Sequence, residues 1–303
     1  MSRKKGRMLD GILLLDKPRG LSSNAALQTA RRLFNARKAG HTGSLDPLAD
    51  GLLPICFGEA TKFSGFLLHA GKRYRVRAKL GARTTTGDAE GEISETASFE
   101  HVTEAAVHKV LANFLGETQQ IPPMYSALKH NGTRLYDLAR RGVEVEREPR
   151  TIHLCELELI RFRDGFMTLE LACSRGTYVR TLVEDIAVAL ETRGHVTELR
   201  RLSLGPFQSE SMYTLDTLER MAGQGGEVLD STLLPVDAAL SQWSSITLNA
   251  DAAFYLRRGQ SVQVSPINAT DQVILYSEEG DFLGIGSVLS DGRVAPKRLL
   301  STN

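Results

Sequence analysis

The chain has 303 residues, which exceeds one typical compact domain, so we expect a large domain followed by a smaller one. Hydrophobic residues make up 42% of the chain, which excludes a disordered protein. No stretch approaches the ~20 consecutive apolar residues that a membrane-spanning helix requires. The formal net charge of +1 does not by itself indicate a nucleic-acid partner.

The N-terminus and the cysteines indicate the compartment. The basic N-terminus is followed only by the apolar run 12–15, which is too short for a signal peptide. The three cysteines, Cys56, Cys155 and Cys173, are far apart and lack the spacing of metal ligands. We therefore expect a cytoplasmic protein that binds no metal.

Charge is unevenly distributed along the chain. Residues 1–40 contain ten lysines and arginines against two acids, and residues 62–83 contain seven bases and no acid. Residues 84–104 then contain six acids and no lysine or arginine. Segregated basic stretches can form a phosphate-binding face in a nearly neutral protein, although they are also common on ordinary solvated surfaces.

The N-terminal third predicts alternating strands and helices. GILLLDK, residues 11–17, is an apolar strand that Pro18 and Gly20 end, and Ser22 begins a group of possible N-caps for the next helix. The next predicted elements are a helix to about residue 34, a loop over 35–51, a buried strand over 52–57 and a helix over about 59–69.

The segment KRYRVRAKLG, residues 72–81, predicts a strand with two distinct faces. Its apolar residues, which include Tyr74, alternate with four bases, so the apolar set faces inward and the bases face outward. Four bases on an open face make a phosphate-facing surface plausible.

The remaining elements follow the same mixed pattern. The segment 84–92 reads as an exposed turn or hairpin, and Thr103 caps a helix that Gly116 ends. Residues 117–150 are irregular, with one short helix near 134–141. We then expect strands over 151–163, 166–174 and 195–204, a helix over 178–192, short helices to about 240 and a β-rich, barrel-like tail from about 245.

The stretch GHTGSLDPLADGLLP, residues 40–54, places the carboxylate of Asp46 among small and apolar residues. A carboxylate that loses water and gains no partner is very costly, so either Asp46 points outward in a turn helped by Pro47, or a cation elsewhere meets it. The residues of this segment alone leave both interpretations open. Asp50 reads as a solvated or capping residue.

Seven ordered segments together resemble the bacterial TruB-type tRNA pseudouridine synthases over most of the chain. The segments are GILLLDKPRGLSSN, GHTGSLDPLADGLLP, GEATKF, KRYRVRAKLG, IPPMYSALKHNG, SRGTYVRTLVEDI and HVTELRRL. The second of them is the most specific. The tail resembles a PUA domain, an RNA-binding module that such synthases carry.

The resemblance implies a fold class, domain boundaries and a reaction. The fold is α+β, with a mixed, mainly antiparallel sheet and flanking helices, and a small β-rich PUA-like domain follows it. The catalytic domain is expected at 1–240 and the PUA-like domain at 245–303. The implied reaction converts uridine 55 of the tRNA T-loop to pseudouridine without a metal or an organic cofactor. It is an isomerisation, which agrees with the lack of a dinucleotide fingerprint or P-loop in the sequence.

The resemblance also assigns catalytic roles. Asp46 acts at ribose C1′ or at the base, where positive charge or a covalent bond can form during cleavage of the glycosidic bond. Arg180 pairs with Asp46, since a nearby cation favours the ionised carboxylate. Tyr74 stacks on the target base, and whether it also removes a ribose proton stays open because its ordinary pKa of ~10 makes it a poor base. On pattern alone, Tyr74 is an inward-facing core residue.

Further residues are assigned to substrate binding by resemblance. The target uridine must be flipped out of its loop, and His41 would take the vacated space while Tyr178 and Leu199 form pocket walls. Without the resemblance, these three are a polar loop residue and ordinary core residues. Candidate phosphate contacts are Lys17, Arg19, Lys62, Lys129 and Arg141. The segment 124–150 is expected to be an insertion that grips the T-arm.

Alternative functions remain open from the sequence. A non-catalytic tRNA-binding or tRNA-folding protein would use the same basic surfaces, and an enzyme could assist folding as well. A hydrolase would need metal-binding acids or a second catalytic carboxylate, for which only Asp50 is near. Archaeal and eukaryotic relatives that act on guided RNA are a third possibility, but we would expect long basic tails in those, and this sequence shows none. We therefore expect a monomer that acts on tRNA without a guide RNA, an accessory protein or a membrane.

Overall fold

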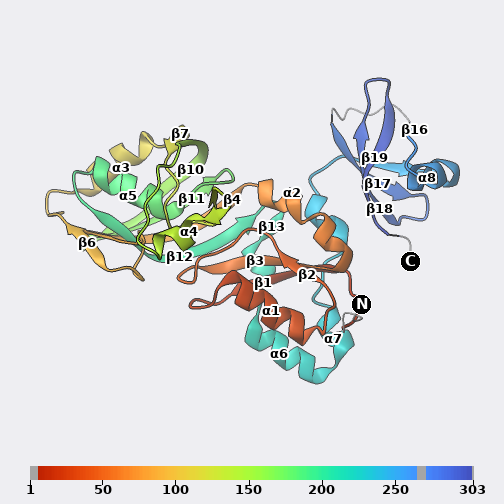
Figure 1. The fold of residues 1–303 in the computed structure, drawn as a ribbon, viewed down its shortest axis with the longest axis horizontal. Helices are drawn as coiled ribbons and strands as arrows, with labels where there is room; N and C mark the ends of the chain where they lie inside the picture. Colours follow the sequence, from red (N-terminus) through yellow and green to blue (C-terminus); the bar gives the residue numbers. More distant parts are fainter. Residues whose placement is uncertain (1–5, 265–270, 302–303) are drawn as a thin grey trace.

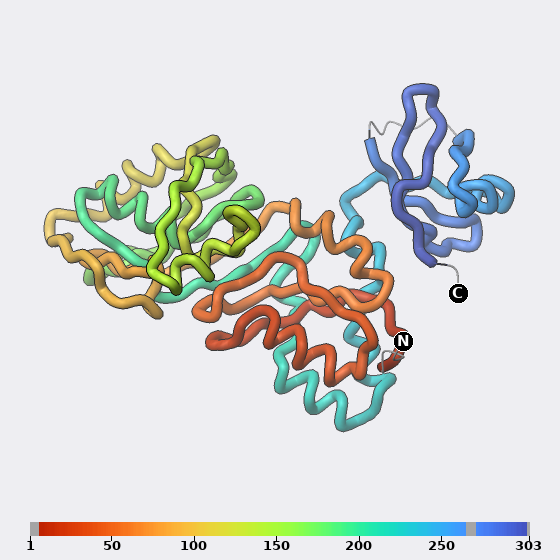
Figure 2. The backbone as a smooth tube through the Cα atoms, viewed as in Figure 1, coloured from red at the N-terminus to blue at the C-terminus, as the bar shows by residue number. Residues whose placement is uncertain are grey.

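The computed structural model describes residues 6–264 and 271–301, which form two parts (Figure 1). An α+β body surrounds one mixed sheet, and a small β-rich unit follows from residue 245. The tube in Figure 2 shows this unit beside the body, at the end of a connecting segment. The predicted fold class, a mixed and mainly antiparallel sheet with flanking helices and a β-rich tail, is confirmed.

The central sheet has ten strands, which are β1 (Gly11–Lys17), β2 (Ala39–His41), β3 (Asp50–Phe57), β4 (Lys72–Leu80), β7 (Gly116–Gln120), β10 (Arg150–Arg163), β11 (Phe166–Cys173), β12 (Gly194–Leu204), β13 (Phe207–Gln208) and β14 (Tyr213–Thr214). Their order is β14-β1-β3-β12-β4-β11-β10-β7, with β2 on β3 and β13 on β12. Two pairs are parallel, β1 with β14 and β3 with β12.

The helices on one face of this sheet are α1 (Ser23–Leu33), α3 (Glu104–Ala112), α5 (Val179–Ala189), α6 (Leu215–Gln224) and α7 (Gly226–Asp230). Their apolar residues share one core with the inward-facing residues of β4, β11 and β12. As predicted, Tyr74 lies on the buried face of β4. Ser22 is the N-cap of α1 and accepts a hydrogen bond from the Ala25 amide.

A second core connects the body to the C-terminal unit. It includes residues of η1 (Gly58–Lys62), α2 (Ser64–His69) and η3 (Val236–Leu240) together with Ile274 and Ile285. The Tyr276 hydroxyl also donates to Asp237 at 2.6 Å. The C-terminal elements are β15 (Ser245–Leu248), α8 (Ala250–Arg257), β16 (Val262–Gln263), β17 (Gln272–Ser277), β18 (Phe282–Val288) and β19 (Arg293–Leu299).

The remaining elements are short and lie outside the sheet. They are β5 (Ala82–Thr84), β6 (Ile93–Thr96), β8 (Lys129–His130), β9 (Thr133–Arg134), α4 (Leu135–Ala139) and η2 (Ser209–Ser211). Within the described residues, no helix is both long and apolar enough to cross a membrane.

Three predicted elements differ from the structure. Gly116 does not end the helix that Thr103 caps, because that helix ends at Ala112 and Gly116 begins β7 with a φ of 87°. The predicted helix over 59–69 is a 3-10 turn followed by the short α2. The tail was expected to be strands and turns, but Asn249 caps the helix α8 with its side chain.

Candidate active site

The loop that carries Asp46 is fixed by its neighbours. The Ser23 hydroxyl at the start of α1 accepts a hydrogen bond from the Leu45 amide (2.7 Å) and donates one to the Leu45 carbonyl (2.9 Å). Gly43 has a φ of 72°, a left-handed conformation that favours glycine. The backbone beside Asp46 is therefore held in place by α1 and by this turn.

Glycine is also required where the loop joins the sheet. Gly51 has a φ of 97°, and a Cβ atom there would lie 2.4 Å from the Arg201 carbonyl oxygen. This close approach lets β3 pair in parallel with β12 at Gly51 and Arg201. The pairing brings the end of the Asp46 loop to the strand that carries Leu199.

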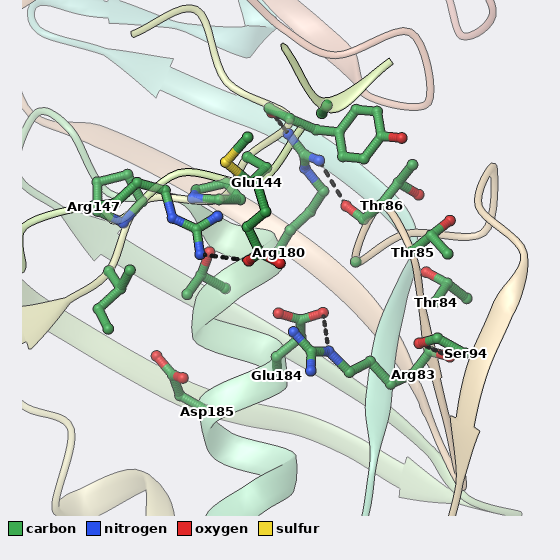
Figure 3. Close-up of a pocket in the computed structure, with 18 of the residues that line it drawn as sticks. Arg83, Thr84, Thr85, Thr86, Ser94, Glu144, Arg147, Arg180, Glu184 and Asp185 are labelled. Carbon is green, nitrogen blue, oxygen red and sulfur yellow. Dashed lines mark hydrogen bonds and ion pairs between the residues drawn. The ribbon is translucent and has the colours of Figure 1, made fainter. Parts of the chain in front are cut away.

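Arg180, in the first turn of α5, pairs with Asp46. Its Nη2 lies 2.9 Å from Asp46 Oδ2, and its side chain is 7% exposed. The same guanidinium donates to the carbonyls of Thr86 (2.7 Å) and Tyr125 (2.9 Å). Figure 3 draws a pocket that Arg180, Thr86 and Glu184 help to line, and in it the Arg180 side chain points toward Thr86. The contact expected between Arg180 and Asp46 is present.

Asp88 is a second carboxylate at this arginine, which sequence analysis did not identify. Its Oδ2 lies 3.7 Å from Arg180 Nε, and the residue is 3% exposed. Its Oδ1 accepts hydrogen bonds from the Thr86 hydroxyl (2.6 Å) and the Glu90 amide (3.1 Å). Arg180 is therefore held between two carboxylates and two backbone carbonyls.

Residues 84–92 were expected to form an exposed turn or hairpin. They do connect the hairpin strands β5 and β6, but the expected exposure is wrong at Asp88. The Val196 amide donates to the Gly87 carbonyl, and the Ala89 amide donates to the Val196 carbonyl. These two hydrogen bonds attach the turn to β12 and bury Asp88. A run of acids in the sequence gave no sign of this long-range pairing.

A cavity of about 280 Å³ opens beside Asp46. Asp46 and Arg180 line it together with Tyr74, Tyr178 and Leu199, so five of the predicted site residues meet there. Tyr74 and Leu199 come from the sheet and are each 7% exposed. Two aromatic rings and a leucine around a carboxylate suit a flat ring held by stacking.

The surroundings of Asp46 change its ionisation. Burial raises the pKa of the Asp46 carboxyl above its ordinary value, and the charge of Arg180 opposes this shift. Asp88 adds to the rise because it is a like charge. The Asp46 side chain is 43% exposed, so its carboxylate is only partly desolvated, and Arg180 offsets part of the cost of that desolvation.

The phenol of Tyr74 is a weaker acid in the folded protein than in water, so a smaller fraction of it is phenolate. Burial raises the pKa of its phenol above the ordinary value, while the charge of Arg201 opposes the shift. The phenol is therefore neutral near pH 7, where it can offer a hydroxyl but little phenolate.

Tyr178 is positioned by a glutamine that sequence analysis also missed. The buried Gln120 donates from Nε2 to the Tyr178 carbonyl (3.1 Å) and accepts at Oε1 from the Tyr178 amide (2.8 Å). This pair of bonds fixes the backbone just before α5, which also carries Arg180.

His41 lies at the end of β2, half-buried, and is absent from the lining of the cavity beside Asp46. Burial lowers the pKa of its imidazole, and the nearby Arg201 charge lowers it further. His41 is therefore neutral near pH 7, and its role in the space that the flipped base vacates stays a prediction.

Two of the expected phosphate contacts are engaged with protein groups. Lys17 is fully buried, its Nζ donates to the carbonyls of Pro18 and Leu21, and burial lowers its pKa to about 8. Lys62 Nζ contacts Glu59 at 2.6 Å, and it donates to the Leu299 carbonyl at 3.2 Å, which links the body to β19. Neither placement fits the expected contact with phosphate.

The other three expected phosphate contacts, Arg19, Lys129 and Arg141, are exposed. Arg19 donates to the Thr197 carbonyl at 3.2 Å. Lys129 and Arg141 have no ion pair within the ranges that the structure covers, so their charges are available to a partner.

The segment 124–150 forms one wall of a groove of about 380 Å³ that reaches Asp46. Tyr136 lies between two exposed arginines of this wall, with the Arg134 and Arg140 guanidinium carbons 5.8 Å and 5.6 Å from its ring centre. Aromatic rings with adjacent arginines are typical of surfaces that bind single-stranded nucleic acid.

Asp50 was expected to be a solvated or capping residue. In the structure it belongs to an ion-pair cluster instead. Arg200 Nη1 lies 2.6 Å from Asp50 Oδ1, and Arg200 Nη2 lies 2.8 Å from Asp16 Oδ2. The cluster joins β1, β3 and β12. Asp50 is absent from the lining of the cavity beside Asp46.

The outward face of β4 is largely neutralised by acids from neighbouring strands. Arg75 contacts Glu170 at 2.5 Å, and Arg77 contacts Glu198 at 3.0 Å. Cross-strand pairs of this kind weaken the prediction of a phosphate-binding face, since little free positive charge remains.

Three family models match the chain. The N-terminal domain of TruB family pseudouridylate synthase matches residues 31–179, the C-terminal domain of tRNA pseudouridylate synthase B matches 180–241, and the C-terminal region of pseudouridine synthase II TruB matches 244–300.

Curated relatives and solved structures agree with these matches. The chain is 50% identical to a tRNA pseudouridine synthase B of Nitrosococcus oceani, over 98% of this chain and 97% of that protein. It is 51% identical to one of Stutzerimonas stutzeri, over 97% and 96%. Its fold resembles two solved structures of Cbf5 complexes. The first is an archaeal box H/ACA sRNP Nop10-Cbf5 complex, with a TM-score of 0.73 and 22% identity over 96% of this chain and 86% of that chain. The second is a Cbf5-Nop10-Gar1 complex, with a TM-score of 0.75 and 24% identity over 96% of this chain and 85% of that chain.

Proposed function

The chain belongs to the TruB family of pseudouridylate synthases, and from this premise we propose that it isomerises uridine 55 in the T-loop of tRNA to pseudouridine. The observation that carries the proposal is the Asp46–Arg180 pair at the edge of a cavity lined by Tyr74, Tyr178 and Leu199. A carboxylate beside a pocket for a flat ring suits chemistry at the carbon that joins sugar and base.

We assign the roles of the site from its geometry. The target uridine flips into the cavity, where Tyr74 and Tyr178 contact the base and Leu199 closes the wall. The Asp46 carboxylate acts at ribose C1′ or at the base, the glycosidic bond breaks, and C5 of the turned base bonds to C1′. Arg180 keeps Asp46 ionised and oriented. The C5 proton leaves to water, and N1, which is released from the sugar, takes up a proton, so that the net change is an isomerisation.

The domain organisation and partners follow from the same proposal. Residues 1–240 form the catalytic domain, with the segment 124–150 as the insertion that contacts RNA, and residues 245–303 form a PUA-like RNA-binding domain. The protein acts in the cytoplasm as a monomer, on the T-arm of tRNA and without a guide RNA, and the tRNA pseudouridine synthases B that are 50% and 51% identical to it support tRNA as the substrate.

The direct test is release of tritium from tRNA that carries it at uridine C5. Formation of the new C5–C1′ bond expels that hydrogen, so the wild-type protein should release it catalytically and yield pseudouridine at position 55. A folded protein that binds tRNA and releases no tritium would instead be a tRNA-binding or tRNA-folding protein.

We predict that the insertion contributes to tRNA affinity through Arg134 and Arg140, which are exposed and form no ion pair with any residue that the structure describes. Replacing Arg134 and Arg140 together by alanine should raise the tRNA dissociation constant about 10-fold and reduce its salt slope by about two, with kcat preserved at saturating tRNA. Filter binding at several salt concentrations measures both quantities. The matched control is Arg163→Ala, since Arg163 is exposed and paired with Asp164 away from the groove. Equal affinities for the two variants would contradict a role of the insertion.

We also predict the acid side of the pH profile. Activity requires ionised Asp46, and its pKa in the protein is raised, so kcat/KM should fall at a pH above the ordinary aspartate value of ~3.9. Tritium release between pH 4 and pH 8 measures the limb. If kcat/KM falls only at or below the ordinary pKa of aspartate, the effect of Arg180 on the pKa of Asp46 is larger than the effect of burial.

A further inference from the structure

Arg201, on β12, is a buried arginine without a carboxylate partner. It is 0% exposed, and its Nε and Nη2 donate to the carbonyls of Leu52 (2.6 Å) and Gly43 (3.1 Å). Its Nη1 is buried and has no hydrogen-bond partner. Across the described ranges, 6–264 and 271–301, no ion pair of Arg201 with a carboxylate is found.

This arrangement is unfavourable for stability. Moving a guanidinium out of water costs several kcal/mol, and a carboxylate partner normally offsets part of that cost. The neighbouring Arg200 shows the usual solution, because it contacts Asp16 and Asp50 on the other face of the strand. A charge that is kept without such compensation is typical of functional sites.

The surroundings of Arg201 connect it to two parts of the active site. Arg201 is paired with Tyr74 in the register of β12 and β4, so both side chains lie on the same face of the sheet. The guanidinium also contacts the Gly43 turn, which begins the Asp46 loop, through a hydrogen bond from Nη2 to the Gly43 carbonyl. A Cβ atom on Gly43 would lie 3.4 Å from Nη1 of Arg201, so the turn packs directly on this group.

We propose that Arg201 is a positioning residue that holds the Tyr74 hydroxyl and the Gly43 turn in one fixed arrangement. Through these two contacts, the ring that meets the base and the loop that presents Asp46 share one rigid support. Burial raises the pKa of Tyr74 and the Arg201 charge opposes that rise, which is consistent with direct proximity to the hydroxyl. The proposal rests on the proposed isomerase activity.

The test compares adjacent arginines on one strand. Arg201→Met keeps an unbranched apolar stem but removes the guanidinium and its donors. It should lower kcat for tritium release about 30–100-fold with KM changed less than about 3-fold, because small misplacements at a site cost up to ~10²-fold. Arg201→Lys, which keeps the charge and fewer donors, should recover part of the loss. The matched control is Arg200→Met, which removes only the ion pairs with Asp16 and Asp50 and should keep kcat within about 3-fold.

A double-mutant cycle with Tyr74→Phe separates positioning from general damage. If Arg201 acts through the Tyr74 hydroxyl, Arg201→Met should slow the Tyr74→Phe enzyme much less than it slows the wild type. Fully additive losses, or wild-type kcat in Arg201→Met, would overturn the proposal. If Arg201→Met does not fold, the same cycle is measured with Arg201→Lys.

A structural readout keeps this proposal distinguishable from the proposed function. In a crystal structure of the Arg201 variant, the Tyr74 ring and the Gly43 carbonyl should be displaced, whereas Arg200→Met should leave both in place. Unmoved groups would refute positioning by Arg201. Absence of tritium release from the wild type would refute the isomerase activity, whatever the variant structures show.

Discussion

Replacing Asp46 by asparagine is expected to abolish tritium release while tRNA binding is retained. Loss of a group that reacts in the transition state typically costs about 10⁴-fold or more in kcat, because the remaining interactions only bind and orient the substrate. Asparagine keeps the size and the hydrogen-bonding capacity of the side chain but has no carboxylate. The dissociation constant should therefore change less than about 5-fold.

Asp50→Asn is the matched control in the same loop-to-strand segment. Asp50 lies four residues after Asp46, pairs with Arg200 and does not line the cavity. Its replacement weakens one partly exposed ion pair, which is worth up to about 1 kcal/mol, and should leave kcat close to wild type. Equal losses in both variants would indicate damage to the loop instead of removal of a reacting group. Full activity of Asp46→Asn would exclude the carboxylate from the reaction.

The sequence was informative wherever a local pattern determined the structure. The alternation in residues 72–81 predicted which face of β4 is buried, including Tyr74, since strand geometry places alternate residues on one side. The fold class was also predictable, because the motifs cover most of the chain. The pairing of Arg180 with Asp46 came from the family resemblance, since no local rule relates residues so far apart in the chain.

Features that depend on long-range contacts were not predictable. Asp88 looked like part of a solvated acidic turn, and only its attachment to Val196 on β12 buries it beside Arg180. The sequence analysis did not identify Arg201, and it predicted a phosphate contact for Lys17, which is fully buried. Their burial depends on where strands far apart in the chain come together, which alternation patterns do not specify.

Arg180→Ala is expected to reduce kcat for tritium release about 10²–10³-fold, as loss of one charged group oriented toward the reacting centre usually does. Without the guanidinium, burial and the Asp88 charge both raise the pKa of Asp46 further, because only Arg180 opposed them at hydrogen-bond distance. The acid limb of the pH profile should therefore move to higher pH. Measurement of kcat at several pH values follows both effects.

Stability must be separated from chemistry in this variant, because Arg180 also neutralises the buried Asp88. Removing one partner of a buried pair can cost about 3–5 kcal/mol, so Arg180→Ala is measured together with Arg180→Lys and with thermal unfolding of each. Lysine keeps the charge but cannot reach Asp46, Asp88 and the Thr86 and Tyr125 carbonyls at once. If Arg180→Lys recovers part of kcat and its acid limb lies near that of the wild type, the positive charge at this position stabilises the ionised Asp46. Normal turnover in folded Arg180→Ala would eliminate the pairing as part of the mechanism, since Asp46 would then function without its cation.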